Sequence, residues 1–237
     1  MTWLSLAASL GASHAYLADP SDPLVDSIGS ADLTLHHGDL PTRTGCRGWE
    51  FGGGRYLWAH TTVSEFGSWE ATFRTFTSLD YQAMLGVRGD GGTHACNLAA
   101  NLDDQLWHYC DDAADTGTDS ATTDPADDKL DDRWHHIVAV RASTTSRKLY
   151  VDGALVATNT ATKTVGTQNV IIIGGTVRSD GTGRGQPWQG ELRQCAIYDG
   201  VFLDEDDVAA LATYRKCPGI GWRYGLHMGN NSGFSIG

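Results

Sequence analysis

Short segments in which apolar and polar residues alternate recur along most of the chain. Within residues 69–76, Trp69, Ala71 and Phe73 fall on one side of an extended segment, and the polar residues between them fall on the other. A period of two marks a β-strand that buries one face. The same pattern predicts further strands, at 50–57, 134–141 and 190–199.

Two other segments strengthen this all-β interpretation. Residues 147–157 predict a β-hairpin, because Asp152 and Gly153 stand between two β-rich runs and tolerate the positive φ of a type I′ turn. Residues 169–174 are apolar on both faces. A short run of this kind is typical of a strand in the middle of a sheet, buried from both sides.

Only one helix is predicted, near the C-terminus. Asp204 is a suitable N-cap, and the acidic residues 205–207 complement the positive end of the helix dipole. Val208, Leu211 and Ala212 then form an apolar stripe. Many short strands with one short helix predict an all-β fold, a sandwich of two antiparallel sheets.

Composition narrows the possible partners. The chain has 237 residues, 41% of them hydrophobic, which is enough to bury the core of one large sandwich. The formal net charge of −12 argues against electrostatic binding to nucleic acid or anionic lipid. Since no run of about 18 apolar residues occurs, no membrane span is predicted.

The hairpin and the segment before the helix carry a family resemblance. Residues 134–157 read WHHIVAVRASTTSRKLYVDGALVA and resemble the hallmark of laminin-G-like domains. Residues 188–211 resemble the closing segment of that family, and residues 14–58 its opening segment. The resemblance implies a concanavalin-A-like jelly roll over residues 1–216, followed by a Gly- and aromatic-rich arm at 217–237.

A calcium site is the leading metal hypothesis, and it centres on Asp26 and Asp32. Carboxylates and nearby carbonyl groups supply the hard oxygen ligands that calcium prefers. The family's F-D-G has become Phe51-Gly52-Gly53, however, which removes a carboxylate. An Asx turn at Asp26 is therefore the favoured interpretation, and no cofactor is expected.

Catalysis is not predicted. Some concanavalin-A-like folds hydrolyse glycans with the carboxylates of an E-x-D-x-E strand, because alternation places these side chains on one face. This sequence has no such motif, and its Glu residues are scattered. His135 and His136 are adjacent on a strand, so they are expected to point to opposite faces and not to share a metal.

Aromatic residues are the better candidates for ligand binding. Trp188 follows a Gly-rich loop, residues 178–187, and is expected to be exposed as a stacking platform, with Arg184 beside it. Trp107 is a second candidate, and Trp58 and Trp222 are further candidates, with core packing as the alternative. Trp134, like Trp69, is expected to pack in the core.

Two further features bear on the setting of the protein. Five cysteines without a C-x-x-C pair are interpreted as buried free thiols. Residues 3–12 are moderately apolar but have no Lys or Arg before them, so we expect a retained segment and no secretion signal. The Asp-rich stretch 111–132 is expected to be a solvated excursion between strands.

These observations favour a non-enzymatic structural or binding protein. Ordering a Gly-rich arm costs about 1–2 kcal/mol per residue, so a neighbouring subunit is expected to bind it. The arm residues concerned are Trp222, Tyr224, Leu226, Met228 and Phe234. Laminin-G-like sandwiches with short extensions are frequent in phage virion proteins, and this sequence resembles one of those. The resemblance implies a virion surface component (capsid decoration, fibre or tail). Its expected partners are other virion proteins or further copies of itself. The alternative is a secreted, extracellular glycan-binding module.

Overall fold

A computed structural model describes twelve segments of the chain. They are residues 1–18, 24–37, 42–43, 48–52, 56–75, 82–89, 95–101, 105–111, 119–122, 129–177, 184–185 and 187–215. The elements are α1 (Trp3–Ser9), β1 (His14–Leu17), β2 (Thr34–His37), β3 (Thr42–Arg43), β4 (Trp49–Phe51), β5 (Tyr56–Val63), β6 (Gly67–Thr75), β7 (Gln82–Arg88), β8 (Ala95–Ala100), β9 (Leu106–Asp111), β10 (Asp119–Thr122), β11 (His135–Ser143), β12 (Ser146–Val151), β13 (Ala154–Asn159), β14 (Gln168–Ile173), β15 (Thr176–Val177), β16 (Arg184–Gly185), β17 (Gly190–Asp199), α2 (Glu205–Ala212) and the 3-10 helix η2 (Thr213–Arg215).

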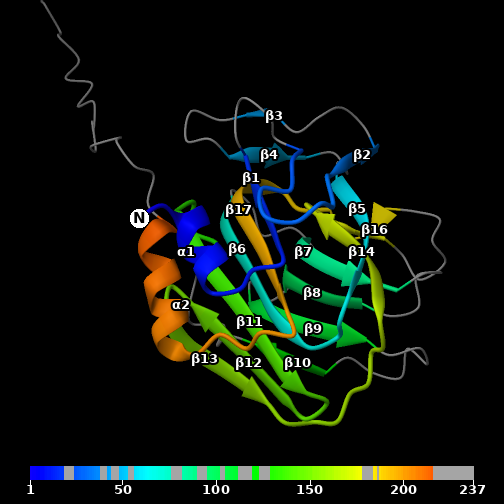
Figure 1. Cartoon of the computed structure of the whole chain (residues 1–237), viewed down its shortest axis with the longest axis vertical. Coiled ribbons are helices and arrows are strands. Elements are labelled where there is room, and N and C mark those ends of the chain that lie inside the picture. The colour runs from blue at the N-terminus through cyan, green and yellow to red at the C-terminus, as the bar shows by residue number, and fades with distance from the viewer. Residues whose placement is uncertain are drawn as a thin grey trace, which may run out of the picture.

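Two antiparallel sheets face each other, as predicted (Figure 1). The eight-stranded sheet has the order β13-β12-β11-β6-β17-β4-β3, and β1 also pairs with β17. The seven-stranded sheet has the order β10-β9-β8-β7-β14-β5-β2, and β15 and β16 form a small separate ribbon. The predicted central strands β11 and β14 both lie inside their sheets, which confirms the all-β sandwich.

The core lies between the two sheets. Alternation along β6 directs Trp69, Ala71 and Phe73 inward, where they meet Leu85 and Ile171 of the opposite sheet. The predicted hairpin is also present. Asp152 and Gly153 form its turn with φ of 52° and 90°, values that suit Asp and Gly in this type of turn.

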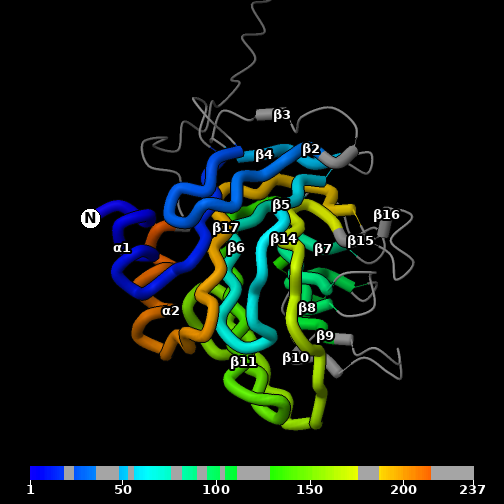
Figure 2. The backbone as a smooth tube through the Cα atoms, turned by 45° about the vertical axis from the view of Figure 1, so that its right-hand side comes forward, coloured from blue at the N-terminus to red at the C-terminus, as the bar shows by residue number. Residues whose placement is uncertain are grey.

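A second apolar layer covers the other face of the eight-stranded sheet. The two α-helices lie side by side on this face, at the side of the molecule away from β7 and β8 (Figures 1 and 2). Trp3 and Ala7 of α1 and Val208 and Leu211 of α2 pack there against strand residues such as Tyr198. The expected cap of α2 is confirmed, since the Asp204 side chain accepts from the N–H of Asp207 at 2.9 Å.

The prediction of a single helix is wrong, because residues 3–9 form α1. Thr2 caps this helix, accepting from the N–H of Ser5 while the Ser5 side chain accepts from the Thr2 N–H. The apolar character of the segment thus reflects a face buried on the sheet. No helix among the described segments is long and apolar enough to cross a membrane.

Candidate functional site

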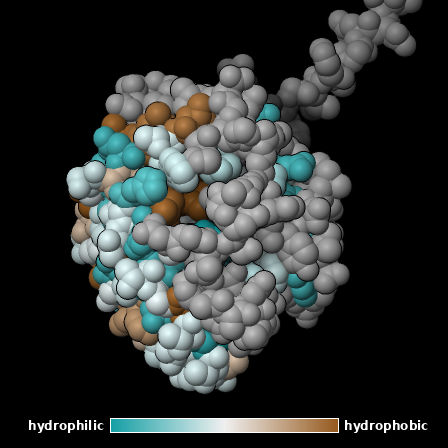
Figure 3. All heavy atoms as spheres, turned by 90° about the vertical axis from the view of Figure 1, so that its right-hand side faces the viewer, coloured by the Kyte–Doolittle hydropathy of each residue, from teal (hydrophilic) through white to brown (hydrophobic). Residues whose placement is uncertain are grey.

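The seven-stranded sheet turns its outer face away from the helices, toward the viewer of Figure 3. Strand register aligns a row of residues across this face: Trp58 of β5, Ile172 of β14, Gly86 of β7, Asn97 of β8 and Tyr109 of β9. Neighbouring strands lie about 4.8 Å apart, so the row is about 19 Å long. The two ends of the row are aromatic.

Each aromatic end consists of a pair of rings. Trp58 lies edge-on to His60, with ring centroids 4.9 Å apart, and Trp107 lies beside Tyr109 at 5.0 Å. His60 is exposed, and Trp58 and Tyr109 are partly exposed. Because alternate residues of one strand share a face, the strands themselves hold each pair together.

The middle of the row is closely packed: Ile172 is 1% exposed, Asn97 is 4% exposed, and Gly86 is buried as well. Gly86 carries no side chain, and the amide of Asn97 lies over the space that a side chain at Gly86 would fill. Ile172 packs beside Val170 and Tyr56 in a small cluster separate from the main core. Figure 3 shows a few hydrophobic residues on this side of the molecule, next to more polar ones. The accessible side chains of the row and its ring pairs therefore lie at the two ends: Trp58 and His60 at one, and Tyr109 at the other.

The Asp26 loop forms a different kind of site, which is rich in donors. The Oδ1 atom of Asp26 accepts from the N–H groups of Ala15, Ile28 and Gly29 at 2.9–3.2 Å. Its Oδ2 accepts from the N–H of Ala31 and lies 2.6 Å from Nδ1 of His14. The loop approaches so closely that a Cβ at position 29 would clash with the Asp26 carboxylate, and glycine is therefore required there.

These hydrogen bonds favour the ionised form of the Asp26 carboxyl group. Burial alone raises the pKa of its carboxyl group, but the bonds from His14 and from the backbone lower that pKa to about 2. Asp32 lies in the same loop, where its Oδ1 accepts from the Asp26 N–H at 3.0 Å. Both carboxylates thus take part in an Asx-turn network of N–H donors, and five contacts already occupy the Asp26 oxygens.

Comparison with known proteins assigns the family. Residues 58–209, well over half of the chain, match the laminin-G-like family described as the concanavalin A-like lectin/glucanases superfamily. The chain belongs to this family. A search of curated proteins finds no match.

Solved structures with the laminin-G-like fold include binding domains of two kinds. The CBM40 domain of the Ruminococcus gnavus IT-sialidase, bound to α2,6-sialyllactose, is 16% identical, with a TM-score of 0.51 over 64% of this chain and 84% of that one. The botulinum neurotoxin serotype D binding domain is 12% identical, with a TM-score of 0.64 over 86% of this chain. The receptor-binding domain of the C/D mosaic serotype is also 12% identical, with a TM-score of 0.63 over the same share.

The laminin-G-like chain spans about half the length of these toxin domains, 52% and 51%. At these identities the likeness extends to the fold. The neighbours are described as carbohydrate-binding and receptor-binding domains, not as catalytic ones. That description is compatible with a domain that binds without catalysing.

The predicted ligand-binding residues differ in where they lie and in how exposed they are. Trp107 lies on the outer face of the seven-stranded sheet, 9% exposed. The prediction that Trp188 is exposed is wrong, since it is fully buried and its ring lies edge-on to Phe73 at 5.7 Å. A Gly-rich stretch predicts a loop, but the large apolar indole at its end fills the space between the sheets. Arg184 belongs to β16, and its side chain is outside the described residues.

Trp58, also a candidate platform from the sequence, lies at the other end of the row, and only the strand register brings it onto the same face as Trp107. Of the tryptophans expected in the core, Trp69 is buried there. Trp134 is only partly buried, with the guanidinium groups of Arg74 and Arg193 over its ring at 5.8 and 5.7 Å. The arm residues 217–237 and most of the Asp-rich stretch are outside the described part of the chain.

The two adjacent histidines point to opposite faces, as expected. Nδ1 of His135 lies 2.8 Å from Asp152, and its Nε2 lies 2.9 Å from Asp131. His136 lies on the helix side, with Nε2 2.8 Å from the Glu70 carboxylate. Each histidine therefore has carboxylate partners of its own.

The fold brings together two glutamates that look scattered in the sequence. Glu50 of β4 and Glu191 of β17 stand directly opposite each other in the eight-stranded sheet. Glu191 is buried and forms an ion pair with Arg74, whose Nε lies 3.2 Å from Oε2. The ion pair gives Glu191 a structural role on this face.

The expectation of free thiols is wrong for two of the cysteines. Cys96 and Cys110 are paired residues of β8 and β9, and they form a disulfide with Cα atoms 4.2 Å apart. Cys195 is free and buried, as expected. Burial raises the pKa of its thiol, which keeps it protonated. The pairing was not visible in the sequence, because it depends on which strands become neighbours.

Proposed function

We propose that this laminin-G-like chain is a non-catalytic binding domain that holds an oligosaccharide on the outer face of its seven-stranded sheet. The observation that carries the proposal is the row from Trp58 to Tyr109, which has an aromatic pair at each end with partly exposed rings. Sugar rings present apolar C–H faces, and these stack on aromatic side chains. The length of the row suits a ligand of several sugar rings.

Polar groups on the same face supply direction. The exposed His60 imidazole lies at one end, and the partly exposed Tyr109 lies at the other. A binding site of this kind combines an apolar surface with a few well-placed polar groups. Because both residues stand on strands, the protein backbone holds them in place before any ligand arrives.

The absence of catalysis is part of this proposal. The solved neighbours are binding domains, and the described Glu50–Glu191 pair has one member held by Arg74. We expect the pure protein to release no reducing sugar from β-glucan or alginate. Robust hydrolysis that is lost in a Glu191→Gln variant would overturn this part of the proposal.

Glycan-array screening followed by calorimetry on the best ligand tests the binding site. Trp58→Ala and Tyr109→Ala should each weaken affinity by about tenfold or more, the equivalent of about 1.4 kcal/mol. Phe202→Ala is the matched control, since Phe202 is 48% exposed just before α2 and away from this face. The proposal fails if no glycan binds, or if the three variants bind equally well.

A virion surface component (capsid decoration, fibre or tail) is the narrower form of this proposal. The Cys96–Cys110 disulfide supports a location outside a reducing cytoplasm, either on a virion or extracellular. The alternation of Trp222, Tyr224, Leu226 and Met228 suits a strand that adds to a neighbour's sheet edge. A chain without residues 218–237 should stay folded but lose oligomerisation or attachment to the particle. If that chain unfolds, or assembles as before, the arm is not an assembly element.

A further inference from the structure

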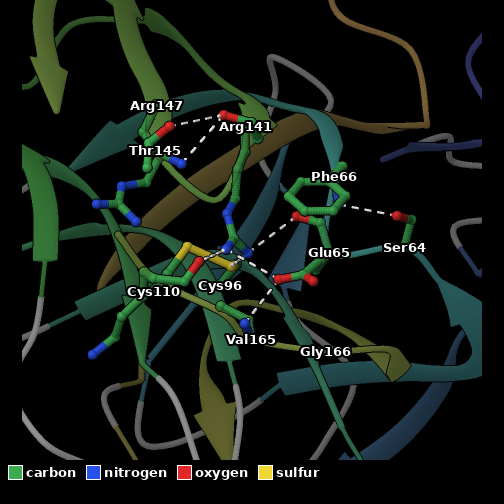
Figure 4. A network of polar contacts seen from close by, with 12 residues as sticks. Ser64, Glu65, Phe66, Cys96, Cys110, Arg141, Thr145, Arg147, Val165 and Gly166 are labelled. Atoms are coloured by element: carbon green, nitrogen blue, oxygen red, sulfur yellow. Dashed lines mark hydrogen bonds and ion pairs between the residues drawn. A yellow bond between two sulfur atoms is a disulfide. The ribbon is translucent and has the colours of Figure 1, made fainter. Parts of the chain in front are cut away.

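A polar cluster interrupts the apolar core at the level of β8 and β9 (Figure 4). From the seven-stranded sheet it contains Cys96, His108 and Cys110, and all three are buried. From the opposite sheet it contains Arg141 and Arg147, also buried. We call these five residues the sulfur–arginine cluster. Nothing in the glycan site described above uses it.

Backbone geometry brings three soft metal ligands together in this cluster. Cys96 and Cys110 are directly opposite each other on paired strands, and His108 lies two residues before Cys110 on the same inward face. Nε2 of His108 is 3.4 Å from Sγ of Cys110. The ligand atoms of all three residues lie within 4.8 Å of one another. Thiolate and imidazole ligands in this arrangement select soft ions such as Cu(I) or Zn²⁺.

Arg141 places a guanidinium group next to the sulfur atoms of the cluster. Nη1 of Arg141 lies 3.6 Å from Sγ of Cys96, and its Nη2 lies 3.0 Å from the Glu65 carboxylate and 2.5 Å from the Lys163 carbonyl oxygen (Figure 4). These contacts hold the guanidinium group in place.

We propose that the reduced form of this chain binds one Cu(I) ion through Cys96, Cys110 and His108. A thiol reductant first opens the disulfide: the two cysteine sulfurs gain two electrons and two protons, and two reductant thiols become a disulfide. Binding of the ion then releases the two cysteine protons. The disulfide and the metal exclude each other, because each occupies both sulfur atoms.

The number of ligands and the charge both favour a monovalent ion. Structural zinc takes four ligands, whereas this cluster of described residues offers three. Two thiolates with Cu(I) carry a net charge of −1, and the Arg141 guanidinium group is in position to stabilise that charge. A zinc bis-thiolate would be neutral and would gain less from the arginine.

The test uses the full chain with the other three cysteines replaced, as Cys46→Ser, Cys195→Ala and Cys217→Ser. This background is reduced with a phosphine, desalted without oxygen, and given the acetonitrile complex of Cu(I). We expect one ion per chain to survive a second desalting, X-ray absorption to show two sulfur ligands and one nitrogen, and Tm to rise by about 5 °C or more.

Two variants in the same background identify the ligands. Cys96→Ser should reduce the retained copper to less than about a tenth of an ion per chain. His108→Gln should weaken copper binding by about tenfold and remove the nitrogen ligand from the absorption spectrum. His60→Gln is the matched control for the copper readouts, because this exposed histidine stands on the other face of the same sheet, and it should leave copper retention and the absorption spectrum unchanged.

Several results would overturn the proposal. They are failure of the reduced background to retain copper, equal retention by Cys96→Ser, or tighter binding of Zn²⁺ than of Cu(I). Near-UV circular dichroism shows whether the reduced, metal-free chain is folded. If it is unfolded, Cu(I) must restore the folded spectrum, and failure to do so also counts against the site. None of these readouts depends on glycan binding.

Discussion

The indole N–H of Trp3 donates to Oε1 of Glu70 across 2.7 Å and so ties the first helix to the middle of the eight-stranded sheet. The same buried carboxylate accepts from the hydroxyl group of Tyr198 at 2.7 Å and lies 2.8 Å from Nε2 of His136. Three elements distant in sequence therefore meet at one charge. A buried carboxylate is stable only when its hydrogen bonds are made.

Removing one of the groups that donate a hydrogen bond to Glu70 should destabilise the whole domain. We expect Trp3→Phe, which keeps an aromatic ring but loses the N–H group, to lower the free energy of unfolding by about 1–3 kcal/mol. Urea unfolding followed by fluorescence measures this change. Ser9→Ala, on the exposed side of the same helix, is the control. Equal stability of the two variants would show that α1 is merely appended to the sheet.

Local signals account for what the sequence predicts well. The Asp152-Gly153 turn and the Asp204 cap each depend on a few neighbouring residues, and both are found where expected. Helix α1 was missed although Thr2 and Ser5 form its capping box, because only the distant Glu70 and the sheet surface explain its burial. A seven-residue helix is marginal without such tertiary contacts.

The candidate sites depend on the register between paired strands, which cannot be predicted from local patterns in the sequence. Trp58 and Tyr109 share a face only because β14, β7 and β8 separate their strands in a defined alignment. The Cys96–Cys110 pair depends on the same alignment. Period-two alternation gives the face of each residue within its own strand but not its neighbour across the sheet. The burial of Trp188 was not predictable for a related reason, since it packs against Phe73 of the distant strand β6.

Asp26 should make stability fall in acid. The folded-state pKa of its carboxyl group, about 2, is below its ordinary value of 3.8, so its contribution is complete above about pH 4 and is lost as pH falls toward 2. Asp26→Asn should lower stability at pH 7 by about 2 kcal/mol or more, because backbone N–H groups lose an ionised acceptor. The same variant should show a flatter acid limb in urea melts at pH 7, 4 and 3. A limb as steep as that of the wild type would assign acid sensitivity to other groups.

Chelation should have little effect on stability. The oxygens of Asp26 already accept hydrogen bonds from four backbone N–H groups and contact His14, which suits a turn better than a calcium shell. We therefore expect EDTA to shift Tm by only about one or two degrees, since only a tightly bound ligand stabilises a protein appreciably. Added calcium should have as small an effect. A drop of about ten degrees on chelation would instead place a metal ion in this loop.

The disulfide should contribute stability through the unfolded chain. Cys96 and Cys110 are 14 residues apart, and closing a loop of this size stabilises a protein by about 3 kcal/mol in the chain-entropy description. Replacing both cysteines with alanine should cost about that much in urea unfolding, and reducing the wild type should cost the same. The reductant should have no effect on the double variant, which separates this disulfide from the remaining cysteines.

A domain of ordinary stability, about 5–15 kcal/mol, survives such a loss, so the reduced chain should stay folded at room temperature. An unfolded reduced chain would mean that the free energy of unfolding is below this range. The sandwich would then form only when a disulfide or a metal ion links Cys96 and Cys110.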